Sequence, residues 1–168
     1  MRFSYACDGI DGLILIDKKY MGELDDQLLG ELDILLDRYR KSELVHDFPN
    51  EKWEDVWRRE TKGIVEFCNS GKMVIFLHYK GEEDCEINFS DLQNGSKTII
   101  EIKSGKLIIV NASELIQCLA YSDLEMETLL EIDNLDVGTY SINFDGINSI
   151  ELRKGGFESC PNNVIELL

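Results

Sequence analysis

Two stretches of this chain resemble each other and predict its frame: KGIVEFCNSGKMVI at residues 62–75 and KTIIEIKSGKLII at residues 97–109. Each is an apolar, β-branched run that is followed by a Ser-Gly-Lys turn and a second apolar run. Runs separated by a glycine-containing turn are typical of β-hairpins. The sequence therefore predicts that residues 62–110 form two successive hairpins of an antiparallel sheet.

Further strands are predicted on both sides of this region. The segment Gly9 to Asp17 is apolar at its centre, and residues 84–89 alternate between apolar and polar positions. A second alternating run, residues 138–144, precedes Asp145-Gly146, a strong turn signal, so residues 147–152 are expected to return as its partner strand with Ile150 and Leu152 facing inward. A short strand is also expected near residues 128–132. Residues 163–168 are expected to form a short edge strand or to remain loose.

Three helices are predicted. The first follows residue 20 and carries an apolar stripe at steps of three and four residues: Met21, Leu24, Leu28, Leu32, Leu35 and Tyr39. After a loop at residues 42–50, a short helix at 51–60 places Trp53 and Trp57 four residues apart. Residues 112–119 form the third, with Asn111 or Ser113 as its cap. The stripe is interpreted as packing on the sheet and the tryptophan pair as a core contact, with partner binding as the alternative for each.

These elements predict an α+β fold, in which an N-terminal helical segment packs against an antiparallel β-sheet built from successive hairpins. A length of 168 residues fits a single domain, residues 1–168. Its helical part is expected at about residues 21–60 and its β-rich part at about 62–168.

The composition is strongly acidic, with 33 Asp and Glu against 17 Lys and Arg and a net charge of −16. Such a charge confers solubility, repels nucleic acid and anionic lipid, and speeds the encounter with a basic protein. No apolar run approaches the roughly 20 residues that span a bilayer, and the first residues do not read as a secretory signal. Five widely spaced cysteines predict reduced thiols and a cytoplasmic location.

The acidic residues are unevenly distributed. Residues 107–152 contain no Lys or Arg, and their acids are densest between Asp123 and Asp136. The simpler interpretation of these acidic residues is a solvated rim of loops, and the more specific one is a docking surface for a basic protein. The predicted partner-binding residues are Asp123, Glu125, Glu127, Glu131, Asp133 and Asp136.

No catalytic motif is recognisable. The Ser-Gly-Lys triplets at 70–72 and 104–106 lack the first glycine of a phosphate loop, because Glu66 and Ile100 stand there. His46 and His78 have no zinc-type spacing with each other or with cysteine, and no C-x-x-C is present. We therefore predict no catalytic residue, no cofactor and no metal, and a protein that is not an enzyme.

The small size, strong acidity, Ser-Gly-Lys turns and Gly138-Thr139-Tyr140 strand resemble bacterial toxin-immunity proteins of contact-dependent inhibition and polymorphic-toxin systems. The resemblance implies a cytoplasmic inhibitor, a monomer or weak homodimer, that binds one cognate toxin domain, for example a nuclease, and occludes its active site. Two alternatives remain open. One is an acidic secretion chaperone or adaptor, and the other is an enzyme whose site joins a carboxylate or a cysteine to His46 or His78.

Overall fold

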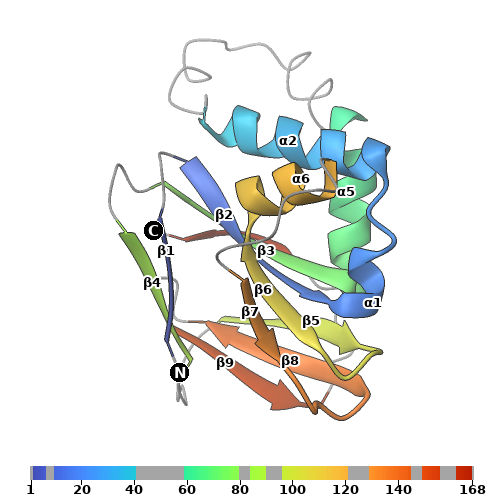
Figure 1. Cartoon of the computed structure of the whole chain (residues 1–168), viewed down its shortest axis with the longest axis vertical. Coiled ribbons are helices and arrows are strands. Elements are labelled where there is room, and N and C mark those ends of the chain that lie inside the picture. Colours follow the sequence, from blue (N-terminus) through green and yellow to red (C-terminus); the bar gives the residue numbers. More distant parts are fainter. Residues whose placement is uncertain are drawn as a thin grey trace.

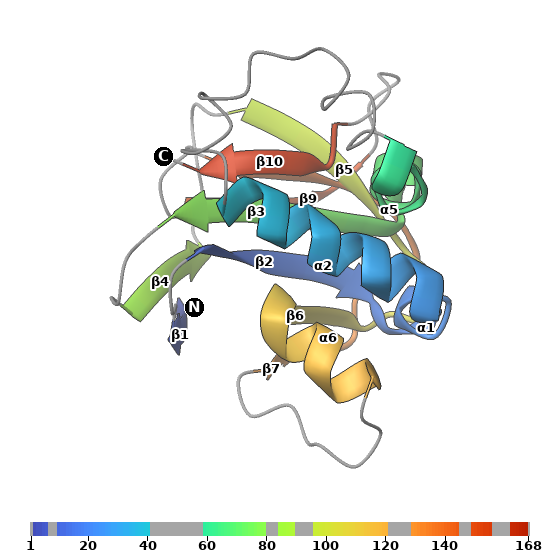
Figure 2. The ribbon, with the colours of Figure 1, turned by 90° about the horizontal axis from the view of Figure 1, so that it is seen from above.

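The chain folds into three layers: helices, a middle β-sheet and an outer β-sheet (Figures 1 and 2). The computed structural model describes residues 2–6, 10–40, 59–79, 84–89, 96–120, 129–144, 149–155 and 162–167. The middle sheet has the strand order β10-β3-β2-β6-β7, and the outer sheet has the order β1-β4-β9-β8-β5. The α+β class predicted from the sequence is confirmed.

Most neighbouring strands are antiparallel, but β10 runs parallel to β3 and β4 runs parallel to β9. The middle sheet consists of β10 (Val164–Leu167), β3 (Met73–Tyr79), β2 (Ile10–Asp17), β6 (Leu107–Asn111) and β7 (Leu129–Ile132). The outer sheet consists of β1 (Arg2–Ala6), β4 (Asp84–Phe89), β9 (Ser149–Lys154), β8 (Gly138–Phe144) and β5 (Ser96–Ile102).

The middle sheet is buried on both faces, which explains its continuous apolar runs. In β2, Leu13 and Leu15 face the outer sheet, whereas Ile14 and Ile16 face the helices. Side chains of β3 and β6 divide between the two cores in the same way. A strand that is covered on both sides cannot show the apolar–polar alternation of a half-exposed strand.

The outer sheet alternates because only one of its faces meets the core. Tyr140 and Ile142 of β8 point into the core between the sheets, and Ser141 and Asn143 lie on the opposite face. Strands β8 and β9 form the predicted hairpin, with Ile142 opposite Leu152, and Ile150 and Leu152 pack into the core as expected. This is the one predicted hairpin that the described strands confirm.

The first of the two similar stretches is not a hairpin. Residues Lys62–Phe67 form helix α5, which ends in the π-turn η1 (Cys68–Lys72) before β3 begins. Ile64, Phe67 and Cys68 fall at helical spacing and are buried against the helical face of the middle sheet. Burial of this stripe outweighs the β propensity of Ile64 and Val65. Gly71 then stops the helix with a φ of 87°, which glycine adopts without strain.

The second stretch is also not a hairpin, although both of its runs are strands. Strand β5 belongs to the outer sheet and β6 to the middle sheet, so residues 103–106 carry the chain from one sheet to the other. Residues 133–137 make the reverse crossing, from β7 to β8. The prediction of two successive hairpins at residues 62–110 is therefore wrong, because a turn between two apolar runs can join two sheets as readily as two neighbouring strands.

The predicted N-terminal helix exists and packs on the middle sheet, but it begins later than expected. A short helix, α1 (Lys18–Met21), is followed by a turn and then by α2 (Asp26–Arg40). The Asp25 carboxylate accepts a hydrogen bond from the Leu28 backbone N–H at 2.9 Å and caps α2. The apolar residues that α2 buries are Leu29, Leu32, Leu35 and Leu36.

Strand β1 is an element that the sequence analysis did not predict, whereas α6, β7 and β10 agree with expectation. Helix α6 (Ala112–Ala120) is capped by Asn111, whose Oδ1 accepts a hydrogen bond from Glu114 N at 3.1 Å. Strand β7 corresponds to the strand expected near residues 128–132, and β10 is the short edge strand expected near the C-terminus. The loop predicted at 42–50 and the helix that would carry Trp53 and Trp57 lie outside the described residues, apart from Arg59 and Glu60.

Two helical glycines give opposite predictions for replacement by alanine. A Cβ on Gly30 of α2 would meet no atom within 4 Å, so Gly30→Ala should raise the free energy of unfolding by about 0.5–1 kcal/mol. A Cβ on Gly63 of α5 would collide with Glu31 Oε2 and would displace this carboxylate, whose Oε1 accepts a hydrogen bond from Gly63 N at 3.2 Å. Gly63→Ala should therefore show no gain in urea unfolding. Equal gains at both positions would contradict the Glu31–Gly63 contact.

Candidate partner-binding site

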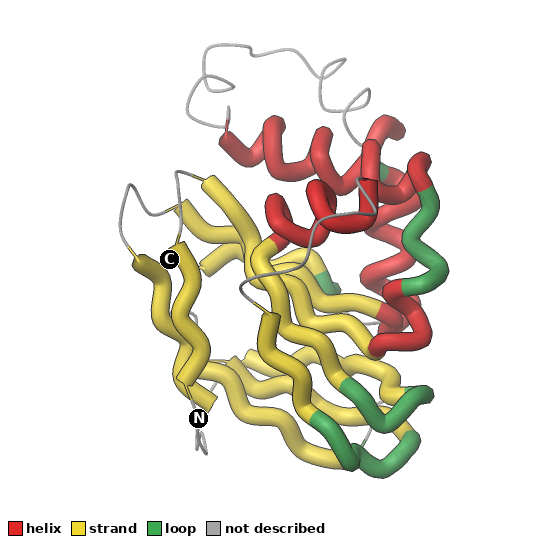
Figure 3. Tube along the Cα trace, viewed as in Figure 1, coloured by secondary structure: helices red, strands yellow, loops and turns green. Residues whose placement is uncertain are grey.

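The two crossings between the sheets lie side by side at one end of the molecule (Figure 3). Their side chains take part in a cluster of hydrogen bonds and ion pairs. Leu135 N donates a hydrogen bond to Gly105 O at 3.0 Å, and this bond ties the 133–137 crossing to the 103–106 crossing. Gly105 has a φ of 77°, and a Cβ there would stand 3.0 Å from Leu135 O. Only glycine therefore satisfies both the backbone conformation and the close approach.

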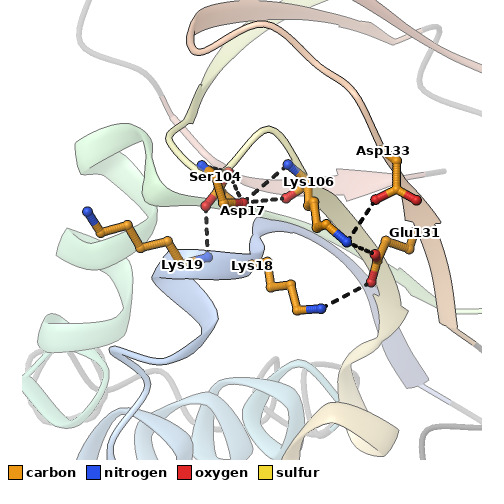
Figure 4. A network of polar contacts seen from close by, with 7 residues as sticks. All are labelled: Asp17, Lys18, Lys19, Ser104, Lys106, Glu131 and Asp133. Atoms are coloured by element: carbon orange, nitrogen blue, oxygen red, sulfur yellow. Dashed lines mark hydrogen bonds and ion pairs between the residues drawn. The ribbon is translucent and has the colours of Figure 1, made fainter.

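Asp17, at the end of β2, holds the 103–106 crossing through hydrogen bonds to its carboxylate (Figure 4). Its side chain is fully buried and accepts four hydrogen bonds. The donors are Lys19 N at 2.8 Å and Lys103 N, Ser104 N and Ser104 Oγ, each at 2.9 Å. A buried carboxylate with this many donors is satisfied by the fold, so Asp17 acts as a structural group.

Two of the predicted partner-binding residues lie in this cluster and contact lysines of the same chain (Figure 4). Glu131 Oε1 is 2.9 Å from Lys106 Nζ, and its Oε2 is 3.6 Å from Lys18 Nζ. Asp133 Oδ1 is 3.1 Å from Lys106 Nζ. The hydrogen bond from Lys106 lowers the pKa of Asp133, and the hydrogen bonds to Glu131 and Asp133 raise the pKa of Lys106.

Asp136 lies in the same crossing and forms an ion pair with a different lysine, Lys154. Lys154 Nζ is 3.1 Å from Asp136 Oδ2, and the Tyr140 hydroxyl donates to the Asp136 backbone oxygen at 3.0 Å. The side chain of Asp136 is nevertheless 79% exposed, and that of Asp133 is 51% exposed. Ion pairs at such exposure contribute only about 0–1 kcal/mol. A competing cation can therefore replace the lysines at little cost.

The structure thus brings Glu131 and Asp133 together at Lys106 and places Asp136 in the same crossing, whereas Asp123, Glu125 and Glu127 lie outside the described residues. Sequence reasoning missed the lysines that face these acids. Lys106 and Lys154 stand just outside the 107–152 interval that contains no Lys or Arg, and the two crossings fold them back onto it. A count of charges that is limited to residues 107–152 leaves these lysines out, and it therefore overstates the negative charge at this end of the molecule.

A second acidic surface, which the sequence analysis did not single out, lies on α2. Asp26 and Asp33 are exposed on this helix, and within the described part of the chain neither has an ion-pair partner. Helix α2 lies on the helical face of the molecule, away from the two crossings (Figure 1). These acids add to the long-range field of the chain, which decays over a Debye length of about 8 Å at physiological ionic strength.

A third polar cluster joins α1, η1 and β5. The Tyr20 hydroxyl donates to Glu101 Oε2 at 2.8 Å, and Lys103 Nζ is 2.7 Å from Glu101 Oε1. Lys72 Nζ lies 5.4 Å from the ring centres of both Tyr20 and Phe67. The hydrogen bond from Lys103 is the largest cause of a lowered pKa of Glu101, and burial, followed by the bond to Glu101, raises the pKa of Tyr20.

This cluster predicts a pH-dependent contribution to stability. Because the folded-state pKa of Glu101 is lowered, its contribution is present above the unfolded value of about 4.3 and is lost as pH falls through the folded-state pKa. Glu101→Gln should therefore lower the melting temperature at neutral pH, and the difference from wild type should vanish in strong acid. The control Glu66→Gln removes only an exposed pair with Lys62, so it should have little effect at any pH. A Glu101→Gln difference that persists in acid would contradict the assignment.

Among the described residues, no three side chains of His, Cys, Asp and Glu gather where they could hold a metal ion. Cys68 is fully buried, and burial raises the pKa of its thiol, which disfavours the nucleophilic thiolate. His46, Cys7 and Cys160 lie outside the described residues, and His78 is described only as a backbone position in β3.

Comparisons with protein-family models, curated proteins and solved structures find no match for this chain. None of the helices in the described part of the chain combines the length and apolar character that crossing a membrane requires.

Proposed function

We propose that this chain is an acidic, cytoplasmic immunity protein that binds a cognate, basic toxin domain and occludes its active site. The observation that carries the proposal is the position of Asp133 and Asp136, which are exposed on a crossing that the rest of the fold holds in place. Carboxylates fixed in this way suit a surface that meets Lys and Arg, because their geometry is set before the partner arrives.

The net charge of −16 supports the choice of a basic protein partner over nucleic acid or an anionic membrane. A field of this sign accelerates association with a positively charged cleft by roughly 10–10³-fold at low salt. A toxin domain that cuts nucleic acid would have such a cleft, since it must attract phosphates. Occlusion of that cleft would inhibit the toxin without any chemistry by the inhibitor.

The test is affinity capture with the tagged chain from a lysate of the cells that express it, washed at low and at high salt and followed by mass spectrometry. The expected result is one basic protein, retained at equal stoichiometry, whose association with the chain slows steeply as salt rises. Capture of an unfolded segment of a secreted protein would instead favour the chaperone or adaptor. Absence of any specific partner at either salt would overturn the proposal.

Two matched variants locate the surface. Asp133→Asn/Asp136→Asn and Asp26→Asn/Asp33→Asn each remove two negative charges, the first from the crossing and the second from α2. Charges at an interface affect association more than distant charges do, so the first variant should slow association more than the second. The opposite order would place the interface on the helical face.

A further inference from the structure

We propose that Val137 is the apolar anchor of this interface and that it inserts into an apolar pocket whose rim carries Lys or Arg, on a basic partner protein. The inference rests on the proposed function, because it names the contact that would set the lifetime of that complex. Val137 is 62% exposed and is the only exposed large apolar side chain among the residues whose burial the structure describes.

Val137 contributes little to the core. Two residues earlier, Leu135 packs against the core between the two sheets, so the 133–137 crossing already has its internal apolar contact. The next residue, Gly138, begins β8. A polar side chain at position 137 would therefore satisfy the fold equally well. Single exposed apolar residues are common on protein surfaces, and what distinguishes Val137 is the rigidity and charge of its surroundings.

The crossing is fixed on both sides of Val137. On one side, Leu135 N bonds Gly105 O at 3.0 Å and Lys106 holds Asp133 at 3.1 Å. On the same side, the Tyr140 hydroxyl bonds the Asp136 backbone oxygen at 3.0 Å, and Lys154 holds the Asp136 side chain. On the other side, Gly138 and Thr139 of β8 pair with Ile102 and Glu101 of β5. A side chain presented on such a restrained segment loses little conformational entropy on binding, which favours a long-lived contact.

The charges beside Val137 specify the chemistry of the occupant. Asp136 precedes it directly and Asp133 lies four residues before it, and both carboxylates are exposed. A pocket that accepts Val137 would bring its rim against these carboxylates, so cations on the rim would be attracted and acids repelled. Lys106 and Lys154 orient the carboxylates in the free chain and can yield to a partner's Arg or Lys.

The anchor has a kinetic signature that differs from that of the acidic residues. Rim charges act mainly on the association rate, whereas a desolvated apolar contact acts mainly on the dissociation rate. Val137→Thr keeps the shape of the side chain but adds a hydroxyl, and it leaves the net charge unchanged. We expect it to raise the dissociation rate by about 10-fold and to leave the association rate and its salt dependence unchanged.

The experiment measures both rates by surface plasmon resonance, with the basic protein retained by the wild-type chain as the probe and with Gln117→Ser, an exposed change on α6, as the control. A faster dissociation for Val137→Thr alone, at unchanged stability in urea, supports the anchor. Equal dissociation rates overturn the anchor but leave the proposed function standing. No retained protein overturns both. Self-association of the wild type that Val137→Thr abolishes would overturn the basic partner as occupant and assign Val137 to a contact between copies of the chain.

Discussion

Replacing Asn163 by alanine is expected to lower the free energy of unfolding by about 3–4 kcal/mol. Asn163 is fully buried just before β10, and its amide joins three parts of the fold. Nδ2 donates to Cys68 O, Met73 O and Ile99 O at 2.8, 3.0 and 3.0 Å, and Oδ1 accepts from the Thr98 hydroxyl. Alanine would leave these partners unsatisfied in a dry interior, where each costs about 1–3 kcal/mol.

The neighbouring Asn162 provides a matched control, because it is exposed and the same substitution there removes no buried bond. Urea unfolding of both variants, followed by circular dichroism, makes the comparison. A loss for Asn163→Ala no larger than that for Asn162→Ala would contradict the role of Asn163 in joining β3, β5 and η1.

Replacing Asp17 by alanine should cost about 3 kcal/mol, since it removes a buried carboxylate that accepts four hydrogen bonds. Asp17→Asn keeps only one acceptor oxygen and should fall between wild type and Asp17→Ala. In a double-mutant cycle with Ser104→Ala, the two losses should be less than additive, because both remove the 2.9 Å bond between Asp17 and Ser104 Oγ.

Asp33→Ala is the control for Asp17, as Asp33 is exposed on α2 and has no ion-pair partner among the described residues. Chemical unfolding of all these variants measures the loss of stability. If Asp17→Ala were as stable as Asp33→Ala, the buried carboxylate would not hold the crossing, and the rigidity attributed to the neighbouring 133–137 segment would lose its support.

The sequence predicted those strands whose pattern of apolar and polar residues reflects which faces of the strand are buried. The continuous run Leu13–Ile16 and the alternation of residues 138–144 both appear in the expected strands, because each reports directly how many of its faces are covered. The prediction of a strand was wrong at residues 62–67, where β-branched residues lie in a helix. The spacing of Ile64, Phe67 and Cys68 is helical, and it was the signal that could have decided between the two.

The pairing of strands and the polar contacts could not be predicted, because both depend on which segments meet in space. Nothing around residues 103–106 distinguishes a turn within a sheet from a crossing between sheets. Apart from Lys19, the hydrogen-bond partners of the Asp17 and Asn163 side chains lie more than 60 residues away in the sequence. For the same reason, the acids at 131–136 could be located from the sequence but their lysines could not.

The most direct test of inhibition is to titrate the retained basic protein with this chain while following the activity of that protein. The activity is expected to fall in proportion to added chain and to reach zero at one molar equivalent, because each bound chain occludes one active site. Val137→Thr should need a larger excess to reach the same end point, owing to its faster dissociation. Stoichiometric binding that leaves the activity intact would contradict occlusion and make the chain an adaptor instead of an inhibitor.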